Sequence, residues 1–339
     1  MSKLNGQATE AAISLLDGAS DRLGKCLIVG ANGFVGAALC RVLKEHQIEF
    51  RALGRRKPEN LSADTDWVVC DLKDTQTHAN SILSGVDTVF YLASIAHSHA
   101  SDEEYHQVNV TLCEQFAALA IAYNVKRFVY LSSTKAMQDC GDQICDESYD
   151  QLPQDSYGRS KRKIESILLT MAFEHLVILR PCLIYGPAIK GNLRSMIKLI
   201  DAGLFPSFSG INNRRSMISV KDVIRAMIAV ALTKSAHREI YLLSDGHDYS
   251  TYHIENAIRK ILGKSNGIRY PLKLLQAFAR MGDMMVPLIG RFPLTTNSLE
   301  KLVGDACFSN HKILTQIGFR CIDSFDDVLP EIIAEYKKQ

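Results

Sequence analysis

The sequence of 339 residues lacks the features that would place it in several specialised classes. Its charge is nearly balanced, with 39 lysines and arginines against 37 aspartates and glutamates, whereas proteins that bind nucleic acids usually carry a clustered basic excess. It has no apolar run near the ~18 residues that a membrane-crossing helix needs, since its best run, Ala226 to Leu232, is much shorter. We therefore expect no nucleic-acid partner and no integral membrane segment.

Cysteines are present, but their spacing does not indicate a set of disulfide bonds or a metal site. The nine cysteines are an odd number, are scattered and include no Cys-x-x-Cys, so we expect neither a secreted disulfide framework nor a zinc site. His97 and His99 look like a metal pair, but no further ligand accompanies them, and a loop beside the site is the favoured interpretation. The start of the chain also lacks the charged and apolar regions of a signal peptide. We expect a cytoplasmic protein with no metal centre.

What the sequence does contain is enough apolar material for a large core, at 47% hydrophobic residues. From Lys25 onward, short apolar runs alternate with helical patterns, which is typical of an α/β protein with a doubly wound parallel sheet. After Pro187 the alternation weakens. The expected strands are Cys26–Val29, Phe50–Leu53, Trp67–Cys70, Thr88–Leu92, Phe128–Leu131, Leu176–Leu179 and Ile240–Leu243. The expected helices are Gly36–His46, Tyr105–Tyr123, Ser160–Glu174, Val220–Thr233 and Tyr252–Leu262.

These patterns divide the chain into three expected parts. Residues 1–24 form a peripheral N-terminal extension, and residues 25–187 form the sheet domain, to which a strand within 235–250 returns. Residues 188–339 form a smaller domain of mixed structure.

Three glycines spaced three apart, Gly30, Gly33 and Gly36, follow the first expected strand and open the first expected helix. Gly30 permits a tight turn, Gly33 lets a pyrophosphate reach the backbone N–H groups, and Gly36 lets the helix pack against the strand. In this context the pattern predicts a Rossmann-type dinucleotide-binding turn. The same turn contributes three further residues to the predicted cofactor site, Asn32, Phe34 and Val35.

The second expected strand ends in Leu53-Gly54-Arg55-Arg56. At this point an NAD-binding chain typically has an acidic residue for the ribose hydroxyls, whereas guanidinium groups suit a 2′-phosphate. Arg55 and Arg56 thus favour NADP over NAD, unless both are solvated surface charges. Asp71, followed by Leu72 past the third strand, suits the adenine amino group, and a helix cap accounts for it nearly as well.

Tyr157 and Lys161 stand four residues apart and share one face of an expected helix. The strand before that helix ends in Ser132-Ser133-Thr134. Because an ammonium beside a phenol stabilises the phenolate, we expect Lys161 to lower the pKa of Tyr157 toward neutrality. Tyr157 then exchanges a proton with the substrate while a nicotinamide carries the hydride.

The glycine turn, the strand-end hydroxyls and Tyr-x-x-x-Lys, in this order, resemble the extended short-chain dehydrogenases, and among them the nucleotide-sugar epimerase/dehydratase family. The resemblance runs from about Lys25 to the C-terminus. It implies that Thr134 hydrogen-bonds the substrate, that Tyr157 is the acid/base, and that Lys161 contacts Tyr157 and the cofactor ribose. It also implies a UDP-sugar substrate, a C-terminal domain that binds it, and a homodimer.

Further positions match this family. The resemblance assigns Asn109 and Pro181 to the cofactor side of the site. Asn192 and Arg215 match residues that meet the nucleotide diphosphate, and a guanidinium fork suits phosphate oxygens. After the fourth strand it assigns Leu92, Ala93 and Ser94 to the cofactor, and Ser94 to the substrate as well.

Two departures narrow the expected reaction. Thr134 is followed by Lys135 and Ala136 where 4,6-dehydratases of the family have an Asp-Glu pair, so water elimination lacks a catalyst. Leu183 stands where many 4-epimerases carry an asparagine, which weakens the transfer of UDP-galactose specificity. We expect NAD(P)-dependent oxidoreduction at C4 of a UDP-sugar in surface-polysaccharide precursor metabolism, by a 4-epimerase or a 4-keto reductase.

Other interpretations stay open. A reductase of a non-sugar carbonyl compound needs the same catalytic residues but not Arg215. A non-catalytic Rossmann redox-sensing or binding protein needs the glycine turn but not Tyr157 and Lys161. The apolar stretch 271–294 can be a lid, a dimer face or a membrane-surface helix, and a lid or an interface is the favoured interpretation.

Overall fold

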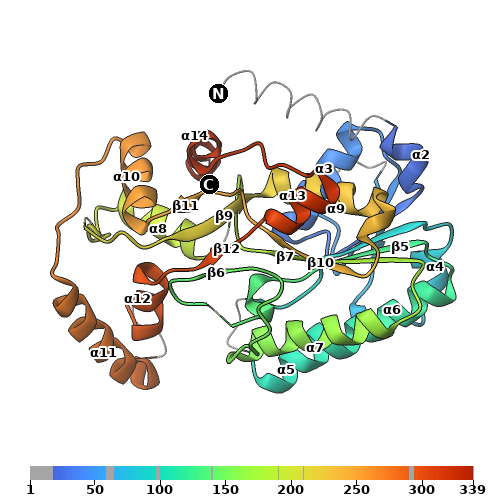
Figure 1. Ribbon diagram of the computed structural model, residues 1–339, viewed down its shortest axis with the longest axis horizontal. Helices are drawn as coiled ribbons and strands as arrows, with labels where there is room; N and C mark the ends of the chain where they lie inside the picture. Colours follow the sequence, from blue (N-terminus) through green and yellow to red (C-terminus); the bar gives the residue numbers. More distant parts are fainter. Residues whose placement is uncertain are drawn as a thin grey trace.

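The centre of the protein is a parallel sheet (Figure 1), seen in a computed structural model that describes residues 18–58, 65–96, 100–138, 140–189, 191–208, 210–289 and 294–338. Within those residues its strands are β1 (Cys26–Val29), β2 (Phe50–Gly54), β3 (Asp66–Val69), β4 (Thr88–Tyr91), β5 (Arg127–Leu131), β7 (His175–Pro181) and β10 (Glu239–Leu243). Their order is β10-β7-β5-β4-β1-β2-β3, so the winding reverses between β1 and β4. The predicted doubly wound α/β fold is confirmed, and each expected strand is present within a residue or two.

Helices cover both faces of this sheet, as expected for strands that bury both sides. One layer contains α3 (Phe34–Glu45) and α9 (Val220–Leu232), and the other contains α4 (Ala79–Leu83), α5 (Asp102–His106), α6 (Leu112–Ala122) and α7 (Ser156–Thr170), as Figure 1 shows. Helix α7 begins where the Asp155 carboxylate accepts a hydrogen bond from the Gly158 N–H at 2.8 Å, a typical N-cap. This cap sets the start of the helix that carries Tyr157.

The end of the expected N-terminal extension is part of the core. Residues 19–23 form α2 (Ala19–Leu23), which packs against α9, and both Ala19 and Leu23 are fully buried. The Leu23 carbonyl also accepts a hydrogen bond from Thr88 Oγ1 at 2.6 Å. These contacts differ from the peripheral position expected for 1–24, while residues 1–17 lie outside the described residues.

The register of the sheet brings the carboxyl ends of the central strands together. Val29 at the end of β1 lies opposite Tyr91 of β4, and Tyr91 lies opposite Tyr130 of β5. Leu131 of β5 in turn lies opposite Leu179 of β7. Ligands of such sheets bind outside the carboxyl ends, where the winding reverses.

The C-terminal part packs its own core beyond this edge. In the described residues it contains a sheet of β8 (Leu183–Tyr185), β9 (Arg215–Ser219) and β11 (Asp248–Tyr249), and β6 (Ile144–Cys145) pairs with β12 (Cys307–Phe308). Its helices are α8 (Asn192–Asp201), α10 (Thr251–Leu262), α11 (Leu272–Ile289), α12 (Thr296–Val303) and α14 (Phe325–Tyr336), whereas α13 (His311–Ile317) packs against β10 of the central sheet. The ring of Phe34, at the start of α3, is partly buried against this core as well as against the sheet core. The start of α3 therefore joins the two parts.

All nine cysteines lie in the described residues, and one pair is joined. A disulfide links Cys140 and Cys145, five residues apart, and the other seven cysteines are free. The sequence had indicated no pairing for these two residues. One bridge across so short a loop does not make a framework of the secreted type.

The described residues contain neither a membrane-spanning helix nor a cluster of metal ligands. No helix there is both long and apolar enough to span a bilayer. No group of three or more histidine, cysteine or acidic side chains is positioned there to hold a metal ion, and His97 and His99 lie outside those residues.

Candidate active site

The glycine turn has the geometry that a dinucleotide requires. Gly30 has a φ of +92°, and a Cβ there would lie 2.8 Å from the backbone nitrogen of Ala93, which follows β4. A Cβ on Gly36 would collide with the Gly30 carbonyl oxygen. Gly33 is the N-cap of α3 and makes no side-chain cap, so the first N–H groups of that helix are left for an anion. The cradle fits the pyrophosphate of NAD or NADP.

The predicted adenosine side lies at the ends of β2 and β3. The amide of Asn32 donates a hydrogen bond to the Arg56 carbonyl at 3.0 Å and thereby joins the glycine turn to this loop. Arg55 and Arg56 are exposed. Asp71 accepts from the Lys73 N–H at 3.1 Å and caps a short 3₁₀ turn, so it makes the cap that the sequence offered as the alternative role.

Tyr157 and Lys161 lie on α7 as expected, but they do not interact as expected. The Lys161 ammonium donates to Tyr130 Oη at 3.0 Å and to the Leu131 carbonyl at 3.1 Å, and it lies 6.0 Å from the centroid of the Tyr157 ring. Burial lowers the pKa of Lys161 to about 8.

The expected lowering of the Tyr157 pKa is wrong for this arrangement. Burial raises the pKa of Tyr157 to about 12, although hydrogen bonds with Ser133 and Ser94 act in the opposite direction. The physical reason is that desolvation outweighs these hydrogen bonds, while the lysine charge is directed to Tyr130 and the end of β5. Tyr157 is therefore a protonated phenol at neutral pH.

Ser133 is a site residue that sequence reasoning missed. Its side chain hydrogen-bonds Tyr157 and also accepts from the Lys135 N–H at 3.2 Å, capping a 3₁₀ turn over 134–136. Thr134, the residue assigned from the resemblance, is 6% exposed at the start of that turn. Three hydroxyl residues in a row gave a signal for the strand end, but not for which hydroxyl faces the tyrosine.

Asn109 ties together three segments of the site. Its side chain exchanges two hydrogen bonds with the backbone of Ile95, at 2.9 and 3.1 Å, and donates to Ser160 Oγ at 3.0 Å. It lies in a π-helical turn, η2 (Gln107–Thr111), inside the helix expected over 105–123. Such turns are frequent at functional sites. Asn109 fixes the segment after β4, which includes Leu92, Ala93 and Ser94, against α7.

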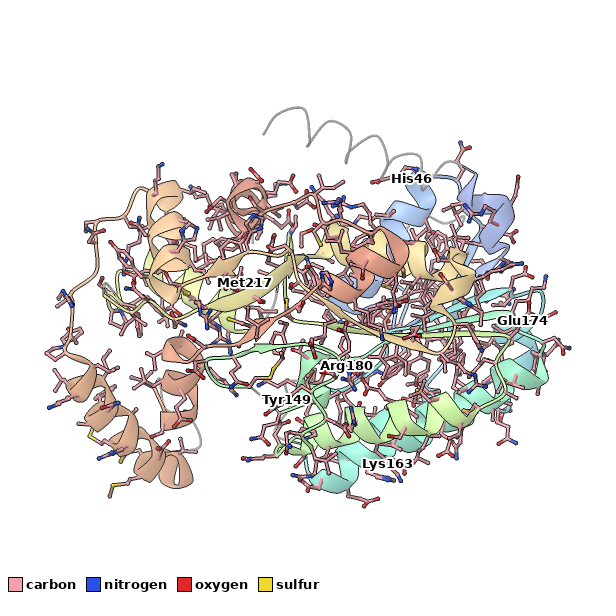
Figure 2. The ribbon with its side chains drawn as sticks, viewed as in Figure 1. His46, Tyr149, Lys163, Glu174, Arg180 and Met217 are labelled. Atoms are coloured by element: carbon pink, nitrogen blue, oxygen red, sulfur yellow. A yellow bond between two sulfur atoms is a disulfide. The ribbon has the colours of Figure 1, made fainter. Side chains whose placement is uncertain are left out.

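A buried ion pair supports the ends of β5 and β7. The Glu165 carboxylate on α7 accepts from Arg180 Nη2 at 2.6 Å and Nε at 3.0 Å, and also from Ser132 Oγ. The side chains of Arg180 and Glu165 are each 1% exposed, and Figure 2 shows Arg180 near the middle of the molecule. Pro181, the next residue, is buried at the end of β7. Glu165 is a second residue that the sequence analysis did not identify.

Arg214, just before β9, and Arg215, the first residue of β9, have different partners. Arg214 pairs with Asp305, at 3.5 Å between Nε and Oδ2. Arg215 donates from Nη1 to the carbonyls of Lys301 and Gly304, at 2.5 and 3.1 Å, near the C-terminus of α12. These two acceptors are neutral carbonyls, whereas the partner of Arg214 is a carboxylate. Asn192 is exposed in the first turn of α8.

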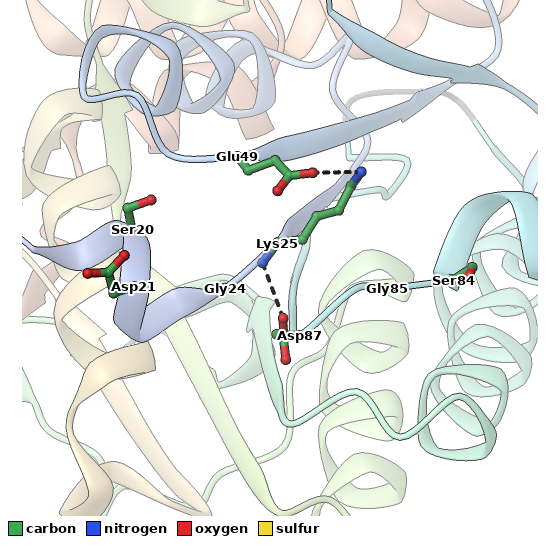
Figure 3. A pocket seen from close by; sticks show the side chains of 8 residues that line it. All are labelled: Ser20, Asp21, Gly24, Lys25, Glu49, Ser84, Gly85 and Asp87. Atoms are coloured by element: carbon green, nitrogen blue, oxygen red, sulfur yellow. Dashed lines mark hydrogen bonds and ion pairs between the residues drawn. The ribbon is translucent and has the colours of Figure 1, made fainter.

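A depression in the surface lies at the opposite edge of the sheet. Figure 3 shows it around Lys25, which forms an ion pair with Glu49 at 2.9 Å and whose backbone N–H donates to Asp87 at 3.3 Å. These residues precede β1, β2 and β4. The depression therefore lies at the amino ends, away from the edge where such sheets bind ligands.

Comparisons with known proteins agree with this geometry. Residues 26–244 match the model of a family described as "NAD dependent epimerase/dehydratase family". The UDP-glucose 4-epimerase of Vibrio cholerae is 28% identical over 82% of this chain and 89% of its own length. An Escherichia coli O157:H7 protein, N-acetyl-alpha-D-glucosaminyl-diphospho-ditrans,octacis-undecaprenol 4-epimerase, is 26% identical over 85% of this chain and 88% of its own length.

A solved structure shares the fold. The UDP-glucuronic acid 4-epimerase of Bacillus cereus, in complex with NAD, has a TM-score of 0.75 at 19% identity and covers 93% of this chain and 99% of its own. At that identity the likeness concerns the fold alone.

Proposed function

The chain belongs to the NAD-dependent epimerase/dehydratase family, and from that premise we propose that it carries out oxidoreduction at C4 of a UDP-sugar. The observation that carries the proposal is that Tyr157 forms hydrogen bonds with Ser133 and Ser94. These residues lie at the carboxyl ends of β4 and β5, next to the glycine turn. A proton donor and hydroxyl groups converge there on the place where a substrate oxygen can be held.

The proposed roles divide the reaction between proton and hydride. Tyr157 gives a proton to, or takes it from, the C4 oxygen, while Ser133 and Thr134 orient that oxygen. Lys161 supplies positive charge near Tyr157. Its ammonium is held by Tyr130 Oη and the Leu131 carbonyl, 6.0 Å from the centroid of the Tyr157 ring. A bound nicotinamide supplies the hydride acceptor or donor at C4.

The α3 N-terminus and the glycine turn would hold the cofactor pyrophosphate, with Asn109 and Pro181 supporting the nicotinamide side. We propose NADP in preference to NAD, because Arg55 and Arg56 are exposed where a 2′-phosphate would lie. Titration of the protein with NADPH and with NADH tests this preference. The Arg55→Ala/Arg56→Ala variant should lose roughly tenfold in NADPH affinity and little for NADH. An unchanged ratio of the two affinities contradicts the preference.

We propose that the protein binds its substrate chiefly through the diphosphate group. Both named relatives are 4-epimerases of diphosphate-linked sugars, one carried by UDP and one by undecaprenol. Arg215, held by neutral carbonyls, and Asn192, in the first turn of α8, are the groups proposed to meet that diphosphate. A non-sugar carbonyl substrate would give Arg215 no such role.

Two reactions share this site, and we place the 4-epimerase first because the two relatives described above carry that activity in their names. The 4-keto reductase is the second candidate, supported by Arg55 and Arg56 and by a tyrosine that is protonated at neutral pH. Incubation with UDP-hexoses followed by product analysis is expected to show C4 epimers. Net oxidation of NADPH with a UDP-4-keto-6-deoxy sugar, and no epimers, would support the reductase instead. No turnover of either kind would support the non-catalytic binding protein. The homodimer and the cytoplasmic location stay predictions.

A further inference from the structure

Helix α11 carries more apolar surface than the protein covers. Leu275 and Ala279 are 9% and 1% exposed and face inward, on the side where α11 packs against α12. Leu274 and Met281, seven residues apart and so on one face of the helix, are 53% and 46% exposed, and Met284 is 76% exposed. A second apolar strip of the same helix therefore faces solvent.

Positive charge borders this exposed strip. Lys273 and Arg280 are also seven residues apart, are exposed, and occupy the neighbouring face of α11. The sequence of α11 contains a single acidic residue, Asp283, whose carboxylate accepts the Thr296 N–H at 3.1 Å. The border of the strip is thus net positive, while the chain as a whole is nearly neutral at +2.

We propose that this docking strip, formed by Leu274, Met281 and Met284 with Lys273 and Arg280 beside it, binds the surface of an anionic lipid bilayer. Helices that lie in the plane of a membrane combine an apolar face that enters the acyl boundary with lysines and arginines that contact anionic headgroups.

Charge argues against a second copy as the occupant. In a two-fold symmetric dimer the same patch meets itself, so the cations of two strips would be brought together without acidic partners on the strip, which is unfavourable. Anionic headgroups are complementary to them. This choice departs from the lid or protein interface that the sequence alone favoured for 271–294.

The strip lies on the substrate side of the molecule. Figure 1 shows α11 and α12 at the end far from α2 and α4. Helix α11 packs against α12, and the Lys301 carbonyl of α12 accepts from Arg215. A bilayer bound to α11 would therefore lie beside residues 188–339, the proposed substrate half, rather than beside residues 25–187, the proposed cofactor half. The proposal does not depend on the proposed function, because lipid binding is measured without turnover.

Sedimentation of the full chain with vesicles tests the proposal. We expect binding to phosphatidylcholine vesicles that contain phosphatidylglycerol, and weaker binding to phosphatidylcholine alone. The Leu274→Ser/Met281→Ser/Met284→Ser variant should lose at least about tenfold in vesicle affinity. Lys273→Gln/Arg280→Gln should lose about fivefold per charge on the anionic vesicles only. Val69→Ser removes an equally exposed apolar side chain from β3, at 60% exposure, and should bind as the parent does.

Hydrogen exchange of the unmodified protein provides a readout that needs no variant. Anionic vesicles should protect the amides of α11 and leave those of α4 unchanged. The proposal is overturned if the parent does not bind anionic vesicles, if the two strip variants bind as well as Val69→Ser, or if α11 gains no protection. Light scattering that shows a dimer lost in the serine variant, without vesicle binding by the parent, would assign the strip to a second copy instead.

Discussion

Each half of the described molecule buries an arginine–glutamate pair. One pair joins a strand to a helix, and the other lies within a single helix. Arg180 and Glu165, 2.6 Å apart, join β7 to α7 and take in Ser132 at the edge where the proposed chemistry occurs. Arg259 and Glu255, 2.8 Å apart, lie one turn apart on α10.

The second pair stabilises only the substrate half. Arg259 donates to the Phe205 carbonyl at 2.7 Å, and Glu255 accepts from the Phe208 N–H at 2.8 Å, so together they attach a loop to α10. The same kind of buried ion pair thus has a different effect in each half, depending on which elements its two residues join. In the proposed cofactor half the buried pair supports Ser132 and α7, which carries the proposed proton donor, and in the proposed substrate half it attaches a loop to α10.

The largest expected difference between the halves is chemical. Tyr157→Phe removes the proposed proton donor and should reduce kcat by about 10² to 10⁴-fold, measured on the active UDP-sugar. The free energy of unfolding should change little, since the ring stays in place. Tyr185→Phe, which removes a hydroxyl bonded to Asp245 in the substrate half, is the matched control and should keep most of its turnover. Full activity of Tyr157→Phe would refute the proposed mechanism.

The second largest effect is expected when the carboxylate of either buried ion pair is removed. Glu165→Gln and Glu255→Gln each leave a buried guanidinium without its carboxylate, which should lower the free energy of unfolding by about 3 to 5 kcal/mol, measured by urea denaturation. In the folded fraction, only Glu165→Gln should lower kcat, because only that pair supports Ser132 and α7. Equal kcat in the two variants would mean that the pairs play the same structural role.

Lys161 should make stability depend on pH in the cofactor half. Its pKa is lowered by burial from 10.5 to about 8, so the folded state resists the charge while the unfolded chain keeps it. The destabilisation is complete below pH 8 and is relieved as the pH rises from 8 toward 10.5. Relative to Lys161→Met, the parent should gain roughly 3 kcal/mol over that range, measured by denaturation at a series of pH values. A difference between the two proteins that does not vary with pH contradicts this account.

The smallest expected effect separates the two arginines of the substrate half. Arg215→Ala should weaken UDP binding by roughly 10- to 100-fold, since a charge-assisted hydrogen bond to phosphate is worth about 1.5 to 3 kcal/mol. Arg214→Ala, which removes a guanidinium already paired with Asp305, should weaken it much less. Calorimetric titration with UDP measures both. Equal losses would place the diphosphate between the two residues, and no loss in either would favour a non-sugar substrate.

Residues whose role depends on local chain geometry could be predicted from the sequence. Gly30 needs a positive φ and Gly36 needs the absence of a Cβ, and both requirements arise within a strand-turn-helix unit that spans few residues. The partner of Lys161 could not be predicted, because Tyr130 lies 31 positions away and is brought near by the pairing of strands and the packing of α7. The same limit applies to Glu165 and Arg180, and to the choice between Ser133 and Thr134.

The sequence by itself therefore determined the class of the fold, the order of its strands along the chain and the cofactor turn, because hydrophobic periodicity and glycine placement act over short distances. Only the tertiary structure decided which groups touch at the site. Tyr157 is held protonated by burial, Lys161 is directed to Tyr130, and Arg215 is held by carbonyls of α12. Each of these outcomes depends on desolvation and on contacts between distant segments, which exist only once the layers have packed.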